Sequence, residues 1–415
     1  MHRDEKLWRN DYSPIEGGIQ TSYSDDYLSL IQLLVEAASL EHSLMTSYLF
    51  GLFSLKPEYN KIAGNLDDLS FLHNSPQTPE GRESLNNPQS IISIAIEEMQ
   101  HLSIINKLLV AIGSSPHVIP HIFPLSSDVY PFRIDLRPLD RFSVAKYLWL
   151  EASTGSLSMH PDASMERESE KLILDVRTTL WNGSFRVGVS PIDIELASHI
   201  GSIYKVILRQ FRKVAESPPP IIPNDFPWGE WEQKIRWVMG QGEINHYRFF
   251  RDLFNGKITT DTDIWKNGIS REGFIWRTAY IGRNDSIENE DARQLSWLSN
   301  LHYWIILSIM DIAYRENSLR LRYTGIDHMT TSLWRLGTHL AEHYNVGLPF
   351  DSMATRYSHG KNDHFSREIL KHLVREAEKI AHILDTKKLL PQNYSRTQFG
   401  LTLMSLSSLP SPIAT

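Results

Sequence analysis

The chain has 415 residues, of which 41% are hydrophobic and 22% charged, and 42 Lys and Arg against 49 Asp and Glu give a net charge of −7. These proportions are typical of a globular protein with one large core or two domains. The acidic balance, without any basic cluster, argues against nucleic acid or an anionic membrane as the main partner. There is no cysteine, which excludes disulfides, zinc knuckles, Cys-ligated iron–sulfur clusters, thiolate-ligated haem and cysteine nucleophiles. Any metal must therefore be bound by His and carboxylate side chains.

Neither a leader nor a membrane span is expected from the apolar pattern. The first fourteen residues carry charges with no apolar stretch behind them, unlike a secretory signal. The most apolar stretch, 304–313, is short and contains Asp311. We therefore expect a cytoplasmic protein.

Helical periodicity dominates the chain, and strand-like alternation is nearly absent. The apolar pattern of the first part predicts helices over 26–53, 88–112, 141–152, 194–214 and 229–254. The second of these ends at Gly113 with Pro116 beyond it, as helix C-termini often do. Three more helical patterns follow at about 295–314, 319–344 and 365–384. The predicted fold is all-α: a bundle over 25–255 with a C-terminal helical extension over 290–385 packed on it.

Three segments outside these helices have a distinct composition. Residues 153–191 are polar and mixed, and are interpreted as an insertion or lid within the bundle. In the Pro-rich connection 114–139, residues 130–136 could form a short extended piece. The tail 405–415, rich in Ser and Pro, is predicted to be disordered.

The most informative residues are carboxylates within the apolar stripes of the long helices. Glu41 lies in the stripe of the first helix, with Leu34, Ala37, Leu44, Met45 and Tyr48 around it. Glu98 lies in the same way on the second helix, and His101 follows it by three residues on the same face, whereas Glu97 is expected to point elsewhere. A charge in such a stripe must be paired or bound.

A second Glu-x-x-His pair, Glu243 and His246, lies on the helix predicted over 229–254. With 26 Glu and 17 His in the chain, about one such pair is expected by chance, so the positions on buried stripes carry more weight than the count. Four-helix bundles that bind two iron or manganese ions use one Glu from each of two helices and a Glu-x-x-His pair from each of the other two. Three of these four contributions are present.

The fourth contribution must come from the chain between Glu98 and Glu243. Glu151 has Val144, Tyr147 and Leu148 on its face, and is preferred. Glu195 is the competitor, but its place in a first helical turn is equally explained by the helix dipole. Four carboxylates would then balance the charge of two Fe(II) ions, with two neutral imidazoles completing the set.

Several other residues have a structural and a functional interpretation. His42, beside the carboxylate stripe, is expected to be a supporting or structural residue rather than a ligand. Tyr48, Tyr204 and Tyr247 could hydrogen-bond the carboxylates or carry a radical, although aromatic residues on such faces are most often core side chains. Haem binding stays open, because His302 or His328 could ligate it.

The segments that carry these residues resemble a known family. Segment 33–56 (LLVEAASLEHSLMTSYLFGLFSLK) and segment 97–117 (EEMQHLSIINKLLVAIGSSPH) resemble the first two helices of the ferritin-like domain of the iminophenylpyruvate dimer synthases. These are the VioB-type and chromopyrrolate-synthase-type proteins of violacein and indolocarbazole biosynthesis. Segments 139–151, 199–204 and 241–250 resemble later parts of the same domain. The chain departs from the family at Ile244, where a glycine is usual, and it is much shorter than the well-known members.

The resemblance implies a ferritin-like four-helix bundle whose metal ligands, which are also its catalytic residues, are Glu41, Glu98, His101, Glu151, Glu243 and His246. Two irons with oxygen and imidazole ligands suit O₂ binding, so the first hypothesis is a di-iron oxidase or oxygenase with O₂ as co-substrate. Its substrate would be a small, amino-acid-derived natural-product intermediate. The alternatives are iron storage with ferroxidase activity, and a non-catalytic helical partner module. Manganese could replace iron, and the chain could form a homodimer.

Overall fold

The computed structural model describes residues 23–64, 90–125, 134–153, 156–157, 168–186, 200–258, 264–267, 273–278, 286–352 and 363–409. Within these ranges every regular element is a helix. The strand-like pairs there are two isolated bridges, Leu55 with Ile275 and Leu125 with Ile134. Ile134 belongs to the segment expected to be extended. The predicted all-α class is confirmed.

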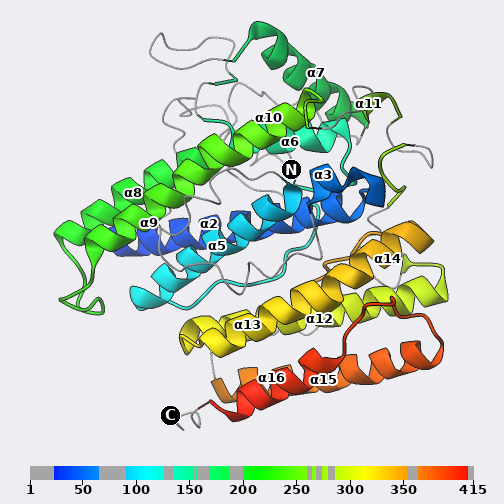
Figure 1. The fold of residues 1–415 in the computed structure, drawn as a ribbon. Helices are drawn as coiled ribbons and strands as arrows, with labels where there is room; N and C mark the ends of the chain where they lie inside the picture. The colour runs from blue at the N-terminus through cyan, green and yellow to red at the C-terminus, as the bar shows by residue number, and fades with distance from the viewer. Residues whose placement is uncertain are drawn as a thin grey trace, which may run out of the picture.

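The bundle is built from helices that fill four positions (Figure 1). Two positions are taken by α2 (Asp26–Phe53) and α5 (Ile91–Ala111), which pack along each other. A third is shared by α6 (Arg141–Glu151) and α8 (Ile200–Glu216). The fourth is the continuous run of α9 (Trp228–Gly240), the π-helical turn η4 (Gln241–His246) and α10 (Tyr247–Phe254). Short helices η1 (Pro57–Tyr59), α3 (Asn60–Ala63) and α11 (Ile264–Asn267) lie at the edges.

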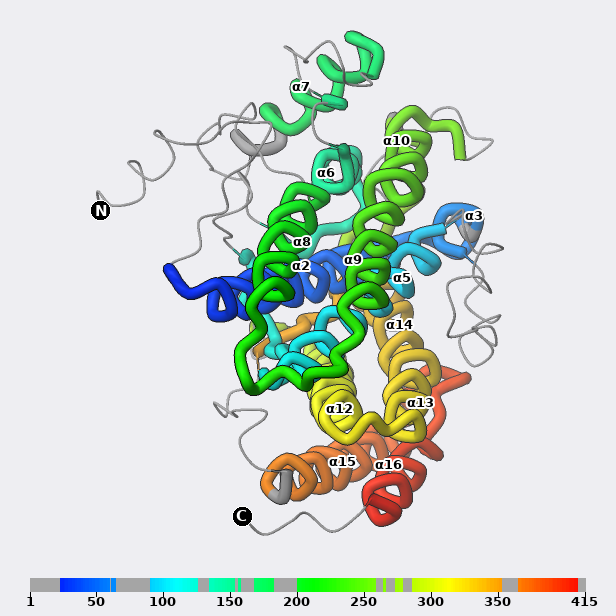
Figure 2. The backbone as a smooth tube through the Cα atoms, turned by 90° about the vertical axis from the view of Figure 1, so that its left-hand side faces the viewer, coloured from blue at the N-terminus to red at the C-terminus, as the bar shows by residue number. Residues whose placement is uncertain are grey.

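The third position of the bundle is interrupted. α6 packs on α10 and α8 packs on α9, and both views show α8 leading on from the end of α6 (Figures 1 and 2). The chain between them includes α7 (Glu170–Arg186), which packs on α6. The predicted polar insertion therefore separates two halves of one bundle helix, and Glu151 is the last residue of the first half.

Local chemistry fixes where the helices begin and end. Asp25 Oδ1 accepts a hydrogen bond of 2.8 Å from the Leu28 N–H at the start of α2, and Asp140 caps α6 in the same way through Ser143. Gly113 has a φ of +90°, a left-handed conformation that suits glycine. The predicted end of the second helix is thus confirmed.

The C-terminal part adds two further layers. α12 (Glu290–Arg315) and the run of α13 (Leu319–His328), η6 (Met329–Leu333) and α14 (Trp334–Tyr344) lie against the bundle, where α12 contacts α5 and α14 contacts α2. α15 (Asp363–Thr386) and α16 (Thr397–Ser407) cover their outer side (Figure 1). The three helices expected here are present, and α16 is an additional one.

The predicted boundary of the disordered tail at residue 405 is wrong. α16 continues to Ser407 because Phe399, Thr402 and Leu406 recur at helical spacing and are buried against the layer beneath. Residues 410–415 of the predicted tail lie outside the described residues.

α2 and α5 lie in the middle of the stack, so both of their faces are buried (Figure 1). One face looks towards α6, α8 and the α9–α10 run, and the other looks towards α12 to α14. Among the described residues, no helix combines the length and the apolar character needed to cross a membrane.

Candidate metal centre

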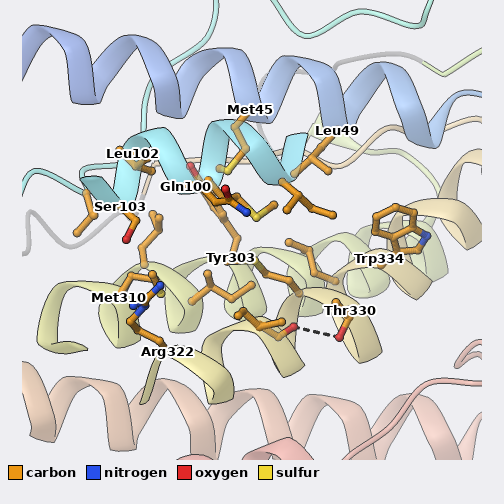
Figure 3. Close-up of a pocket in the computed structure, with 18 of the residues that line it drawn as sticks. Met45, Leu49, Gln100, Leu102, Ser103, Tyr303, Met310, Arg322, Thr330 and Trp334 are labelled. Carbon is orange, nitrogen blue, oxygen red and sulfur yellow. Dashed lines mark hydrogen bonds between the residues drawn. The ribbon is translucent and has the colours of Figure 1, made fainter. Parts of the chain in front are cut away.

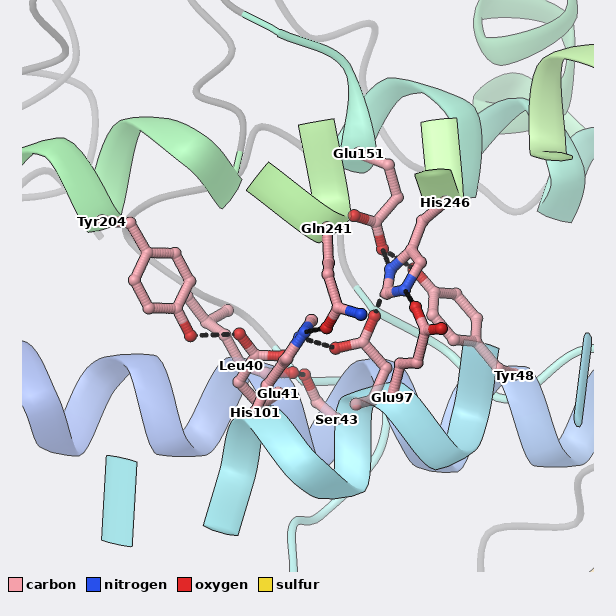
Figure 4. Close-up of polar contacts among 11 residues, drawn as sticks. Leu40, Glu41, Ser43, Tyr48, Glu97, His101, Glu151, Tyr204, Gln241 and His246 are labelled. Atoms are coloured by element: carbon pink, nitrogen blue, oxygen red, sulfur yellow. Dashed lines mark hydrogen bonds and ion pairs between the residues drawn. The ribbon is translucent and has the colours of Figure 1, made fainter. Parts of the chain in front are cut away.

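Two groups of buried Glu and His side chains lie between the α2–α5 layer and the opposite half of the bundle (Figure 4). In the first group, His101 Nδ1 lies 3.1 Å from Glu98 Oε2 and 3.5 Å from Glu41 Oε2. Glu98 and His101 come from one face of α5, and Glu41 comes from the facing side of α2. The predicted pairing of these three residues is present in the structure.

The second group shares Glu98 with the first. His246 Nδ1 from η4 lies 2.9 Å from Glu98 Oε1 and 3.5 Å from Glu151 Oε1. The rings of His101 and His246 stack with their centroids 5.6 Å apart. The carboxylate of Glu98 therefore has one oxygen towards each histidine, and lies at the centre of the cluster.

Two residues outside both groups contact the Nε2 atoms of the histidines, on the side of each ring away from the carboxylates. His101 Nε2 lies 2.9 Å from Gln241 Oε1, and His246 Nε2 lies 2.7 Å from Glu97 Oε2 (Figure 4). Both partner atoms are acceptors, so each Nε2 carries the hydrogen and donates it. In the neutral ring this leaves the lone pair on Nδ1, which is the nitrogen that faces the carboxylates. Such outer hydrogen bonds are usual for metal-bound histidines.

Two tyrosines hold the carboxylates. Tyr48 Oη donates a hydrogen bond of 2.5 Å to Glu151 Oε1, and Tyr204 Oη donates to Glu41 Oε1. Tyr247 points elsewhere and donates to Glu168. Core packing was the favoured interpretation of these three residues; the alternative, a hydrogen bond to a cluster carboxylate, is observed for Tyr48 and Tyr204 and not for Tyr247.

The electrostatics of the cluster follow from its burial and its excess of carboxylates. Burial, together with the neighbouring Glu98 carboxylate, raises the pKa of Glu41 to about 8. Burial opposes the charged form of His101, but the carboxylates of Glu41 and Glu98 outweigh it and raise its pKa to about 10. The pKa of His246 is raised for the same reason, against its burial, by Glu98 and Glu151. The carboxylates of the cluster therefore favour positive charge at these positions.

Several buried oxygen and nitrogen atoms of the cluster have no hydrogen-bond partner, and a metal ion would satisfy them. Glu41 Oε2, Glu98 Oε1, Glu151 Oε2 and His246 Nδ1 form no hydrogen bond, although the last lies only 2.9 Å from Glu98 Oε1. Orphaned buried acceptors of this kind are costly in a folded protein. Carboxylate oxygens and imidazole nitrogens are ligand atoms for iron and manganese, so the donor set fits such an ion in each group.

Glu243 is the one predicted site residue that the structure leaves outside both groups. Its Oε1 forms an ion pair of 3.2 Å with Lys205 Nζ on α8, in a notch where a Cβ on Gly201 would lie only 2.9 Å from the Glu243 Cγ. The expectation that Glu243 and His246 share a face is wrong, because a π-helical turn bonds residue i to i+5 and changes which residues line up. Gln241, five residues before His246, takes that place. A ligand role for Glu243 stays a prediction.

Sequence reasoning missed Glu97 and Gln241. Glu97 was expected to point away, but it is buried and contacts His246. Its signal was the run Ile91–Ile96, in which nearly every residue is apolar, because a helix apolar all round has no solvent face. Gln241 had no such signal, since its contact depends on the π-helical turn.

The remaining candidates are placed as follows. Glu195 lies outside the described residues, whereas Glu151 is fully buried within the cluster. His42 Nε2 contacts Tyr303 Oη at 2.8 Å, towards the C-terminal layers, which fits its predicted structural role. His302 and His328 contact each other through Nδ1 at 2.9 Å, and their Nε2 atoms contact Tyr394 and Thr402. All four ring nitrogens of this pair are engaged, so neither histidine presents a free nitrogen to a haem iron.

A helical bundle with Glu and His side chains converging from facing helices is the arrangement of the di-iron and di-manganese carboxylate proteins. Comparison of the sequence with known families gives the same class: the Ferritin-like family model matches residues 34–242, half of the chain. The chain belongs to the ferritin-like family. No curated protein and no solved structure matches it. Family and buried Glu/His groups together fit a di-iron protein.

Proposed function

We propose that the chain is a non-haem di-iron enzyme that uses O₂ to oxidise or oxygenate a small organic molecule. The observation that carries this proposal is the convergence of orphaned carboxylate oxygens and histidine Nδ1 atoms in two groups that share Glu98. One ion would be held by Glu41, Glu98 and His101. The other would be held by Glu98, Glu151 and His246, and Glu243 could join only by leaving Lys205.

The residues around the cluster have defined tasks in this proposal. Gln241 and Glu97 keep Nδ1 of each histidine unprotonated and aimed inward. Tyr48 and Tyr204 hold one oxygen of Glu151 and of Glu41, which leaves the other oxygen free to bind. When bound, two irons would supply the electrons that reduce O₂.

Burial supports an oxidative role. The side chains of the two groups are at most 2% exposed, and the rings of Tyr147 and Phe250 pack against Tyr48 at 4.6 and 5.1 Å. A site enclosed in this way excludes water, and it keeps a reactive oxidant on its substrate.

The narrower features of the proposal rest on the sequence resemblance to the iminophenylpyruvate dimer synthases. It suggests an amino-acid-derived intermediate as the substrate, as an argument by analogy. Manganese in place of iron, a homodimer and a cytoplasmic location stay predictions.

Anaerobic loading with Fe(II), followed by measurement of O₂ uptake, tests the proposal. We expect about two irons per chain and O₂ consumption that Glu98→Gln abolishes. Glu378→Gln, at an exposed position on α15, is the matched control and should behave as the wild type. Fewer than about one iron per chain would refute the proposal. Growth of an iron mineral within a shell-forming oligomer on size-exclusion chromatography would favour storage. An unchanged melting temperature after chelation would favour the partner module.

A further inference from the structure

A second site lies on the other side of α5. An apolar cavity of about 170 Å³ lies between the α2–α5 layer and α12 to α14 (Figure 3). It is lined on α5 by Ile96, Met99 and Ser103, which face away from Glu98 and His101 on the same helix. The helix therefore separates the cavity from the metal centre, and the proposed enzyme function does not use it.

The size and lining of the cavity suit one aromatic ring. A buried apolar cavity of about 150 Å³ in another protein stays dry and binds benzene. Here two edge-to-face ring pairs contribute to the wall: Phe53 with Trp334 at 5.3 Å, and Tyr303 with Phe350 at 5.1 Å. Aromatic rings prefer this geometry with one another, so a ligand ring would gain more than apolar burial alone.

One end of the cavity is polar. Figure 3 shows Ser103 and Arg322 together at the end opposite Trp334. Burial raises the pKa of the Tyr314 hydroxyl to about 12, and Ser103 and Arg322 both lie close enough to that hydroxyl to oppose the rise. Nearby Tyr323 is 37% exposed and also lines the cavity, so the polar end is the one that reaches solvent.

Within the described residues, the guanidinium at this end has no carboxylate partner. Arg322 is half-buried, and no carboxylate among the described residues forms an ion pair with it. By contrast, half-buried Arg251 pairs with Glu168 at 2.9 Å. A planar guanidinium binds a carboxylate through two parallel hydrogen bonds, so the missing partner has a defined chemistry.

We propose that this cavity binds a small aromatic carboxylate, with the ring within the apolar lining next to the polar end and the carboxylate on Arg322. Both ends of the cavity are needed for binding. The apolar end buries the aromatic ring of the ligand, and the guanidinium of Arg322 selects a ligand that carries a carboxylate. The proposal does not depend on bound metal.

Calorimetric titration of the metal-free protein with 3-phenylpropanoate tests it, with the uncharged 3-phenylpropanamide as the comparison ligand. We expect the acid to bind at least about tenfold more tightly than the amide. Arg322→Gln should remove that preference, and leave the affinity for the amide unchanged. Arg320 is exposed on the same helix and does not line the cavity, so Arg320→Gln is the matched control. This variant should keep the preference for the acid over the amide.

Two further measurements test the place and the chemistry of binding. Leu307→Trp, which fills the cavity from α12, should abolish the binding of both ligands. The result for Arg322→Gln stands independently if this variant does not fold. Equal affinity for acid and amide, or an unchanged preference in Arg322→Gln, would overturn the proposal. Tighter binding of octanoate than of 3-phenylpropanoate would overturn the assignment of an aromatic body.

Discussion

Replacement of Glu98 by Gln should remove both ions, whereas replacement of Glu41 should remove only one. Glu98 is the member that the two groups share, with Oε2 3.1 Å from His101 Nδ1 and Oε1 2.9 Å from His246 Nδ1. Glu41 contacts only the first histidine, at 3.5 Å. The amide keeps the volume of the side chain and removes its charge, so the change tests binding rather than packing.

The size of the effect follows from the position of the carboxylate. Loss of an outer partner of a metal ligand lowers affinity by about 10- to 100-fold, so loss of a direct ligand should cost at least about 100-fold. This corresponds to about 2.8 kcal/mol for each ion. At a free metal concentration about tenfold above the wild-type dissociation constant, simple mass action gives about 1.8 ions per chain for the wild type, about 1.0 for Glu41→Gln and about 0.2 for Glu98→Gln.

Anaerobic equilibrium dialysis against Fe(II), followed by elemental analysis, measures these ratios. Glu378→Gln serves again as the control for an ordinary surface acid. If Glu98→Gln keeps one full ion, the carboxylate does not bridge the two groups and the reasoning from its two contacts is refuted. Equal losses in Glu41→Gln and Glu98→Gln would refute it as well.

Three further predictions address the surroundings of the site and the C-terminal layers. Gln241→Leu and Glu97→Leu should each lower the affinity for one ion by about 10- to 100-fold and spare the other, as resolved by calorimetric titration. Gly242→Ala would place a Cβ 2.9 Å from Glu151 Oε2. In the same dialysis it should therefore weaken the binding of only the ion held by Glu98, Glu151 and His246. Loss of both ions would contradict this placement. Burial lowers the pKa of His302 and takes that of His328 to about 3, so below about pH 6.5 the unfolded chain binds protons that the folded chain does not. The free energy of unfolding should therefore fall by about 1 kcal/mol per histidine between pH 7 and 5.5, and urea unfolding of His328→Gln should show a shallower decline than the wild type.

Local patterns predicted the helices well where one physical signal dominated. The first helix was expected over 26–53 and is observed as Asp26–Phe53, because its apolar stripe and the capping residue Asp25 lie next to each other in the sequence. α16 was missed because its flanks are rich in Ser and Pro, although Phe399 and Leu406 lie on one face. Composition outweighed periodicity in that prediction, and burial against the neighbouring layer decided the outcome.

The site was predictable as far as the helices keep an ordinary α-helical period. Glu41, Glu98, His101 and Glu151 lie where their stripes put them. The face that Glu243 was expected to share with His246 is not observed, because the π-helical turn that moves it is not visible in spacing. The cavity beyond α5 could not be predicted at all, since its wall comes from segments as far apart as Phe53 and Trp334.

The π-helical turn also bears on how the site could change in evolution. Such a turn encloses one residue more than an α-helical turn, so it is equivalent to a one-residue insertion in the α9–α10 helix. Deletion of Gly242 would return the helix to the α-helical phase and put Glu243 and His246 on one face again, three residues apart. A single insertion or deletion in this turn could therefore move Glu243 towards the cluster or away from it, so that two descendants of one sequence would differ in ligand set without the substitution of any ligand.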